Sequence, residues 1–478
     1  MKYITGEDRN QFSMIPICFD EIIAEDNPVR VIDAYVDKLD MEELGFVRAT
    51  PAKTGRPGYN PKDLLKLYIY GYMNRIRSSR RLESEASRNL EVIWLINNLK
   101  PDFKTIADFR KDNKEAIKKV FKHFTILCRE WDLFGKELVA IDGSKFKAQN
   151  SKRKNYNKKK IHRNLKYIEE KINEYIKALE ENDESESCDR KPTKEEIQKR
   201  IEELKARKSI YEEYKERLEN EDISEISTTD PDARLMSNNN KIEVCYNVQT
   251  AVDSKHKLIL DYDVINNPAD QGQLYNMSNK AKKILEVEEL EVLADKGYYK
   301  GSDLKKCIGN GITPYVAKQV ISNGTGERDY YPDKFIYDKE KDIITCPQGQ
   351  ILECKRYRKI QGEKYKVYSN FEACQGCAFK DKCTKAKKGR EVIRWVYQDL
   401  LDEIDKQTEK NKEKYRQRQM IVEHPFGTIK RGLDSYYLLT RGIESVSTEI
   451  SLSFFTYNLK RVINILGVNK MIAKLAAI

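Results

Sequence analysis

The N-terminal part of the chain carries apolar side chains at helical spacing. After Asn60-Pro61, an N-cap followed by a first-turn proline, leucines and tyrosines recur every three or four positions until Asn74. A second helical run starts at Ser78 or Ser79, and a third, starting near Thr105, carries a stripe of phenylalanines. We therefore predict a helical domain over residues 1–130.

Beyond this domain the apolar residues gather in short runs typical of strands. Such runs occupy 138–142, 244–252, 257–265 and 291–295, and ITPYVA adds another. Helical patterns follow at about 271–285 and after Ser302. Strands in this alternation with helices predict a three-layer α/β domain whose sheet contains both parallel and antiparallel pairs. We assign it to residues 131–478.

Two segments interrupt this α/β domain. Residues 150–225 contain a basic stretch and then two apolar stripes at three-and-four spacing, the second opened by the capping box Thr193-x-x-Glu196, which predicts an inserted helical hairpin. Residues 325–390 are rich in Tyr, Lys and Cys and alternate in the manner of strands, which predicts a β-rich insertion. A long helix is expected from Val392 through Lys430, and more helix from Ser445 to the end.

The charge balance points to polyanionic partners. The chain has 478 residues, of which 88 are Lys or Arg and 77 are Asp or Glu, giving +11. The segment from Lys145 to Lys166 contains no acid and suits phosphate contacts, although a solvated basic loop would have the same composition. The sequence has neither a long apolar run nor a secretory leader, so we expect no membrane association and a cytoplasmic, nucleoid-associated location.

Four of the ten cysteines gather within the second insertion. They are Cys346, Cys374, Cys377 and Cys383, and only Cys374 and Cys377 form a close doublet. In a cytosolic protein such a cluster favours a structural Zn²⁺ site over disulfides, with reduced structural thiols or an iron-sulfur cluster as the alternatives. Cys354 is a substitute ligand.

Three acids are candidates for chemistry. Asp142 and Asp295 each close a buried strand, at the end where ligands of α/β sheets bind, although a turn residue would look the same. Glu423 lies on the long helix, seven positions before Lys430. Carboxylates that converge with cations could hold two Mg²⁺ or Mn²⁺ ions for phosphodiester chemistry. A phosphate-binding glycine loop and a zinc-protease motif are both missing, which disfavours nucleotide hydrolysis and His-based zinc catalysis.

These residues lie in segments that resemble a known family. The segments are GRPGYNPKDLLKLYIYGYMNRIRSSRRLE, KTIADFRK, AIDGSKFKA, TDPDARLM, YNVQTAVD, ADKGYY and VEHPFGTIKR. Together they resemble bacterial insertion-sequence transposases of the DDE type, and the similarity extends over nearly the whole chain. The resemblance implies an α/β fold with an RNase H-like mixed-sheet core, an N-terminal helical DNA-binding domain and the two insertions.

The resemblance also implies roles for single residues. Asp142, Asp295 and Glu423 would be the catalytic, metal-binding acids. Lys430 and Arg418 would contact phosphate, although Arg418 precedes Glu423 by five residues, one more than is usual in a related branch. Further candidate DNA-binding residues are Lys145, Arg56 and Arg80.

The function that this implies is Mg²⁺-dependent strand cleavage at the ends of an insertion sequence and strand transfer to target DNA. The partners would be the terminal inverted repeats of the element and the target DNA, bound by a homo-oligomer. Two alternatives stay open. One is a catalytically inactive DNA-binding protein derived from a transposase, and the other is a metal-dependent nuclease.

Overall fold

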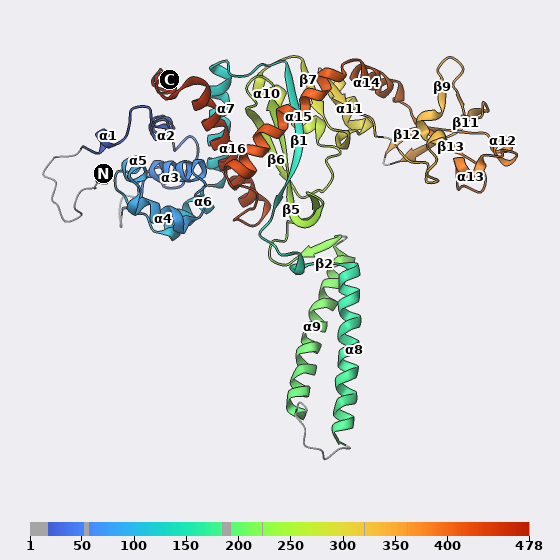
Figure 1. Ribbon diagram of the computed structural model, residues 1–478, viewed down its shortest axis with the longest axis horizontal. Coiled ribbons are helices and arrows are strands. Elements are labelled where there is room, and N and C mark those ends of the chain that lie inside the picture. Colours follow the sequence, from blue (N-terminus) through green and yellow to red (C-terminus); the bar gives the residue numbers. More distant parts are fainter. Residues whose placement is uncertain are drawn as a thin grey trace, which may run out of the picture.

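The computed structural model describes residues 18–51, 57–183, 193–221, 223–319, 321–360 and 362–477. Three bodies follow one another in Figure 1: a group of N-terminal helices, a central sheet covered by helices, and a second sheet at the far end. A long helical hairpin projects from the central body. The expected combination of a helical N-terminus with a mixed α/β sheet is confirmed.

The N-terminal helices are α1 (Phe19–Ile22), α2 (Pro28–Asp37), α3 (Pro61–Met73), α4 (Ser79–Arg88), α5 (Leu90–Leu95), α6 (Phe103–Asp112) and α7 (Lys114–Glu130). Asn60 caps α3 as predicted, because its side chain accepts a hydrogen bond from the backbone of Lys62. The second and third helical runs of the sequence are each broken in two, at Asn89 and Asn113. Asp102, not Thr105, caps α6.

The central sheet has six strands: β1 (Leu138–Lys147), β4 (Arg234–Asn238), β5 (Lys241–Asp253), β6 (Ile259–Ile265), β7 (Leu290–Ala294) and β8 (Ile312–Val316). Their order is β4-β5-β1-β7-β8, and β6 also pairs with β5. The pairs β1–β7 and β7–β8 are parallel, whereas β5 is antiparallel to β1, β4 and β6. Strands β1, β6, β7 and β8 therefore all point the same way.

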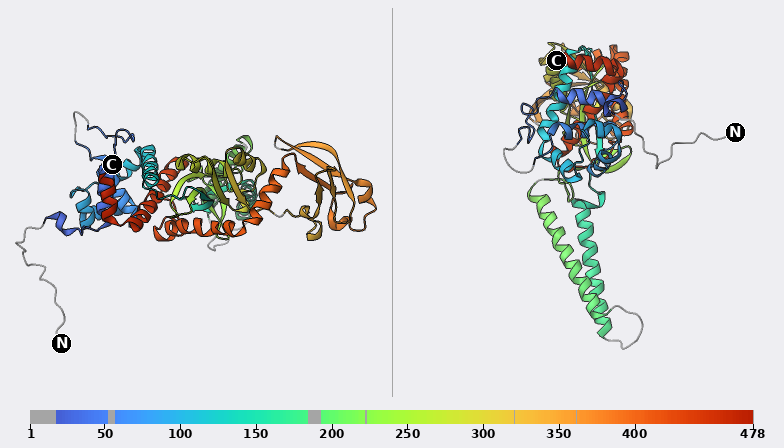
Figure 2. Two further views of the ribbon diagram at one scale, coloured as in Figure 1. Left: turned by 90° about the horizontal axis from the view of Figure 1, so that it is seen from above. Right: turned by 90° about the vertical axis from the view of Figure 1, so that its left-hand side faces the viewer.

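The helices of this body are α10 (Leu274–Leu285), α11 (Gly301–Gly309), α14 (Gln398–Lys410), α15 (Lys412–Gly427), α16 (Ile443–Leu466) and α17 (Val468–Ala476), and a π-helical turn, η5 (Thr428–Gly432), follows α15. Helices α10 and α15 both pack on β1, β5 and β7, one on each side of the sheet (Figure 2). The prediction of one helix from Val392 through Lys430 is wrong. Val392 lies in a strand, and the helix that begins at Gln398 breaks at Asn411.

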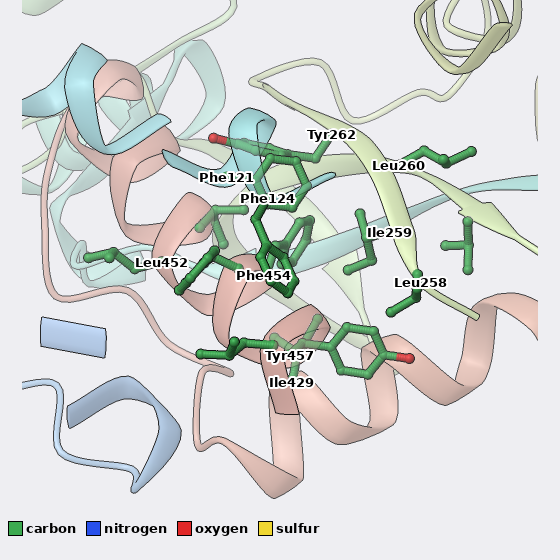
Figure 3. Close-up of a cluster of buried hydrophobic side chains, with 14 of the residues drawn as sticks. Phe121, Phe124, Leu258, Ile259, Leu260, Tyr262, Ile429, Leu452, Phe454 and Tyr457 are labelled. Atoms are coloured by element: carbon green, nitrogen blue, oxygen red, sulfur yellow. The ribbon is translucent and has the colours of Figure 1, made fainter. Parts of the chain in front are cut away.

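One continuous hydrophobic core joins the N-terminal helices to the central sheet. Figure 3 shows α7, β6 and α16 meeting in it. The ring of Tyr262 on β6 packs edge-on against Phe121 of α7, with centroids 5.4 Å apart, and against Phe454 of α16, 5.3 Å apart. Helices α2 and α3 also pack on the C-terminal helices. The two ends of the chain therefore fold together.

The first insertion is the predicted hairpin of α8 (Lys158–Asp183) and α9 (Lys194–Asn220). It stands on a small ladder of β2 (Asn155–Asn157) and β3 (Glu225–Ser227), preceded by the turn η1 (Lys152–Lys154). Its own core of Ile161, Leu218 and Ile226 is separate from the main one. The capping box at Thr193 and Glu196 is present.

The second insertion forms a separate antiparallel sheet with the order β13-β12-β11-β10-β9. Its strands are β9 (Ile336–Asp338), β10 (Ile343–Thr345), β11 (Ile351–Ile360), β12 (Glu363–Ser369) and β13 (Glu391–Trp395), and the short helices α12 (Phe371–Gln375) and α13 (Lys380–Cys383) lie between β12 and β13. A small core around Phe335, Leu352 and Tyr368 holds it together. The sheet extends past the predicted boundary at 390.

Candidate active site

Two neighbouring parallel strands deliver the first two predicted acids to one edge of the sheet. Ile141 on β1 pairs with Ala294 on β7, and this is the last pair of the ladder. Asp142 is the next residue of β1, and Asp295 directly follows the end of β7. Adjacent strands are about 4.8 Å apart, so the two carboxylates lie side by side at the edge where ligands of α/β sheets bind.

Each carboxylate is oriented by a nearby backbone amide. Asp142 Oδ1 accepts a hydrogen bond of 2.9 Å from Gly143 N, and Asp295 Oδ1 accepts one of 2.6 Å from Gly297 N in the turn η2 (Lys296–Tyr298). Both residues are only partly exposed. The geometry confirms that the sheet brings these two residues together, whereas their catalytic role stays a prediction.

The surroundings of Asp142 disfavour its charge. Burial raises the pKa of this carboxyl to about 7, and the negative charges of Asp295 and Asp270 act in the same direction. The positive charge of Arg418 and the Gly143 amide oppose the rise. Asp142 therefore lies among three charged neighbours, and a bound cation would relieve the cost of ionising it.

Asp270 is a fourth acid at this site, and the sequence reasoning missed it. It lies in the loop after β6, and its Oδ1 accepts hydrogen bonds from Asn247, Gln249 and Lys145. A topological signal could have found it. Because β6 runs parallel to β1, the loop that leaves β6 emerges at the same edge as Asp142 and Asp295.

The three predicted basic residues near the site, Arg418, Lys430 and Lys145, differ in their bonding partners. Arg418 lies close enough to Asp142 to lower the pKa of that carboxyl, and it forms no ion pair with another described residue. Lys430 is held inside, because its Nζ donates to Ser144 Oγ and to the Lys145 carbonyl, each at 2.7 Å. Burial lowers the pKa of Lys430 to about 8. Lys145 is paired with Asp270 at 3.2 Å.

Glu423 does not join the other two acids in this structure. It is exposed, and its Oε1 accepts a hydrogen bond of 2.6 Å from Gln419, one turn earlier on α15. A helix advances about 100° per residue, so a separation of five residues from Arg418 places Glu423 on a different face of the helix. Within the described residues, no three His, Cys, Asp or Glu side chains form a group that could bind one metal ion.

Arginines of the N-terminal helices differ in how exposed they are. Arg80 is exposed beside the ring of Phe103, 5.1 Å from its centroid, so it is open to a phosphate. Arg77 is instead buried, and it pairs with Glu449 of α16 at 3.3 Å. Arg56 lies outside the described residues.

The basic segment after β1 contains both exposed side chains and one that is bonded to the backbone. Lys152, Arg153 and Lys154 of η1 are exposed. Lys160 is not available in the same way, because its Nζ donates to the backbone carbonyls of Lys152, Arg153 and Asn155, at 3.2, 2.7 and 2.7 Å. Lys160 therefore stabilises the turn that presents the other three charges.

The four clustered cysteines line one cavity of about 40 Å³ in the second sheet. Cys346 Sγ accepts a hydrogen bond of 3.3 Å from Gln350 N, as thiolate ligands often do. A Cβ at Gly389 would lie 2.6 Å from Cys374 Cβ, so a glycine is needed there. The thiols surround the cavity but, in the described chain, are not drawn together into a finished metal site. Cys354 does not line the cavity, so it is not favoured as a substitute ligand.

Comparison with known proteins identifies two segments. Residues 345–463 match the family model described as "Transposase DDE domain", and residues 17–112 match the one described as "Transposase domain (DUF772)". Two segments of the chain are therefore similar to transposase domains, one of them a DDE domain, which supports the coarse form of the resemblance, whereas an origin in a bacterial insertion sequence stays a prediction. The first match includes Glu423, Lys430 and the four cysteines and begins after Asp295.

Other comparisons are less informative. None of the curated proteins matches this chain. A structure titled as a piggyBac transposase synaptic complex with hairpin DNA overlaps 94% of this chain and 79% of its own, with 8% identity and a TM-score of 0.31, which supports no argument. Among the described helices, none is long and apolar enough to cross a membrane.

Proposed function

We propose that this chain is a DNA transposase that cuts DNA strands at the ends of its own mobile element and joins them to target DNA. The observation that carries the proposal is the Asp142–Asp295 pair at one edge of the sheet, beside Arg418, which has no ion-pair partner among the described residues, in a chain that matches a transposase DDE domain over residues 345–463. We further propose that the sheet is an RNase H-like core. The antiparallel β5–β6 hairpin on one side of β1 and parallel β7 and β8 on the other support this.

The donor set at the pair suits Mg²⁺ or Mn²⁺. Mg²⁺ prefers oxygen ligands and is commonly held by one or two carboxylates together with phosphates of the substrate. Asp142 and Asp295 provide two carboxylates, and the pKa of Asp142 is raised by burial first and by the charges of Asp295 and Asp270 after it, so a cation would favour the ionised carboxylate. Two bound ions would activate the attacking oxygen and neutralise charge on the leaving oxygen.

The cations around the pair have separate tasks in this proposal. Arg418 lacks an ion-pair partner among the described residues and lies beside Asp142, so it is the residue placed to bind the phosphate under attack. Lys430 holds the segment after Asp142 in place through its hydrogen bonds to the Ser144 side chain and the Lys145 carbonyl. It acts on the site mainly through these two bonds.

Glu423 is proposed as the third acid on the strength of the sequence motif and its place in the matched domain. To act there it would have to leave Gln419 and turn toward the aspartates, because this structure holds it on another face of α15. DNA binding could supply that rearrangement, since catalytic contacts often tighten only in the substrate complex.

The DNA would lie across the exposed basic groups near the site. The exposed groups of this kind in the described part of the chain include the η1 turn and Arg80. Arg56 is a further candidate from the sequence and lies outside the described residues. Phosphate contacts of this kind make binding strongly dependent on salt. Joining two ends requires both in one assembly, so we propose a homo-oligomer as the active form.

The function can be tested by a strand-joining assay. The purified chain is incubated with duplexes that carry the DNA ends flanking its own gene, with Mg²⁺ or Mn²⁺. Asp142→Asn is the test variant, and Asp263→Asn, which alters a partly buried carboxylate paired with Lys280, is the matched control. We expect joined products from the native chain and the control but not from Asp142→Asn.

Each alternative function has its own outcome. Nicks without joined products would favour the metal-dependent nuclease. Tight binding to the ends without cleavage under either metal would favour the inactive DNA-binding protein. Joined products that persist in Asp142→Asn would overturn the assignment of the acidic site.

We also propose that Cys346, Cys374, Cys377 and Cys383 hold a structural Zn²⁺. Support comes from the convergence of all four thiols on one small cavity, although they would have to close in further to bind the ion. Four thiolates are a common ligand set for structural zinc. The ion would then link β10, α12 and α13 within a sheet whose own apolar core is small.

A further inference from the structure

Asp270 has more bonding partners than a surface loop carboxylate usually has. Its Oδ1 accepts hydrogen bonds from Asn247 Nδ2 at 2.7 Å, Gln249 Nε2 at 2.8 Å and Lys145 Nζ at 3.2 Å. Asn247 and Gln249 both belong to β5, and both are buried. Three donors on one oxygen, two of them from the sheet, show that the position of this carboxylate is fixed.

The same partners connect the two turns that follow the paired acids. Gln249 Oε1 accepts a hydrogen bond from the hydroxyl of Tyr298, which belongs to the η2 turn directly after Asp295. On the other side, a Cβ at Gly143 would lie 2.5 Å from Asp270 Oδ1 and 2.3 Å from Gln249 Nε2. The backbone directly after Asp142 therefore presses against Asp270 and its partner.

The second oxygen of Asp270 faces the turn after Asp295. In the described part of the chain it accepts no hydrogen bond, and it lies 3.8 Å from the point where a Cβ on Gly297 would be. Asp270 thus touches the surroundings of both acids without bonding to either. A residue in this place can set the distance and direction between them.

We propose that Asp270 is a positioning residue: it gathers Lys145, Asn247 and Gln249 on one oxygen and, through them, holds the turns that carry Asp142 and Asp295 in register for a divalent cation. This inference rests on the proposed function, because it assumes that the two acids bind such an ion. Outer partners of metal sites commonly change metal affinity by about 10–100-fold when they are removed.

The test is the affinity of the intact chain for Mn²⁺ alone, measured by calorimetry. Asp270→Ala removes the acceptor, and Asp270→Asn keeps an oxygen for the three donors but removes the charge. Asp263→Ala is the matched control, since it removes a carboxylate that bonds to Lys280 at 2.9 Å and Asn276 at 3.1 Å and does not accept a hydrogen bond from any described partner of Asp270. Thermal unfolding of each variant without metal is measured in parallel.

We expect Asp270→Ala to weaken Mn²⁺ binding by about 10-fold or more, Asp270→Asn to weaken it less, and Asp263→Ala to leave it unchanged. If Asp270 only stabilised the fold, its variants would melt earlier but the folded chain would bind Mn²⁺ normally, and that result would overturn the inference. Asp270→Asn keeps the test valid if Asp270→Ala does not fold. A native chain that binds no Mn²⁺ would overturn the proposed metal site and this inference with it, whereas native binding with unaffected variants would overturn this inference alone.

Discussion

Asp142 and Asp295 are the first residues beyond the last parallel pair, Ile141 and Ala294, of strands β1 and β7. Their separation is therefore set by the backbone of the sheet and not by the rotamers of long side chains. A pair of residues on two loops would be held less rigidly than this pair at the ends of two bonded strands. An ion bound between the two carboxylates would meet a prearranged pair.

The burial of Asp142 predicts a cost in stability that depends on pH. Its carboxyl has an ordinary pKa of 3.8, and burial raises that pKa to about 7 in the folded chain. Between those values the folded chain binds the proton more tightly than the unfolded chain, so the free energy of unfolding falls as the pH rises through this window. Without metal, Asp142→Asn should melt at a higher temperature than the native chain at pH 8 and at the same temperature near pH 4.

Thermal unfolding monitored by circular dichroism, in chelator, checks this prediction. Added Mg²⁺ should raise the melting temperature of the native chain at pH 8 and have little effect on Asp142→Asn, because the ion and the substitution each remove the cost of a buried, uncompensated carboxylate at this position. Asp263→Asn serves as a control for loss of any carboxylate. A native chain more stable than Asp142→Asn at pH 8 in chelator would contradict the account.

Glu423 and Gln419 provide a paired test of the third acid. If Glu423 turns toward the aspartates when DNA binds, Glu423→Gln should lower the cleavage rate at least about 100-fold. Gln419→Ala removes only the hydrogen-bond donor that Glu423 has in this structure, and it should change the rate little. Single-turnover cleavage of end DNA measures both. Normal cleavage by Glu423→Gln would remove this residue from the site.

The buried ion pair between Arg77 and Glu449 predicts a large effect on stability. Glu449 also accepts hydrogen bonds from the backbone of Leu439 and Thr440, and it joins α16 to the N-terminal helices. Glu449→Gln would leave the Arg77 charge buried without a counter-ion, which typically costs about 3–5 kcal/mol. We expect a loss of that order in urea unfolding.

A surface pair between the same parts of the chain is the control for this measurement. Lys114 on α7 and Glu444 on α16 lie 3.4 Å apart, but the glutamate is 73% exposed. Glu444→Gln should change the free energy of unfolding by less than about 1 kcal/mol. Equal effects of the two substitutions would show that burial does not distinguish them.

The cysteine cavity predicts a stoichiometric zinc content. Metal analysis of the purified chain should find one Zn²⁺, and Cys374→Ser together with Cys377→Ser should remove it and destabilise the second sheet. Cys354→Ser, in the same sheet but outside the cavity, should keep the ion. A metal-free native chain purified with zinc present would contradict the proposal.

Much of the fold could be predicted from the sequence because its signals are local. Asn60 caps α3, the capping box opens α9, and the short apolar runs became the strands of the central sheet. The strand ending at Trp395 was missed because a five-residue strand within a helix-rich segment leaves too little periodic signal. The breaks at Asn89 and Asn113 were missed because an asparagine is compatible with both a helix interior and a cap.

The candidate site divides in the same way. Asp142 and Asp295 could be predicted because each ends a recognisable strand, and parallel strands place such residues together. For Asp270 the direction of β6 indicates only the edge at which its loop emerges, whereas the residue itself lies five positions beyond the strand and is fixed by tertiary contacts with β5. The burial of Arg77 was likewise invisible, because its partner Glu449 is far away in the sequence.

The central claim is that Asp142 and Asp295 bind the divalent ion on which DNA cleavage by this chain depends. Replacing each aspartate by cysteine tests this claim most directly. A thiolate is a poor ligand for Mg²⁺ but accepts softer ions such as Mn²⁺ more readily. The account predicts that Asp142→Cys and Asp295→Cys are inactive on end DNA with Mg²⁺ and regain measurable cleavage with Mn²⁺, while Asp263→Cys behaves like the native chain with both ions. Cleavage by both site variants with Mg²⁺ at the native rate would contradict it.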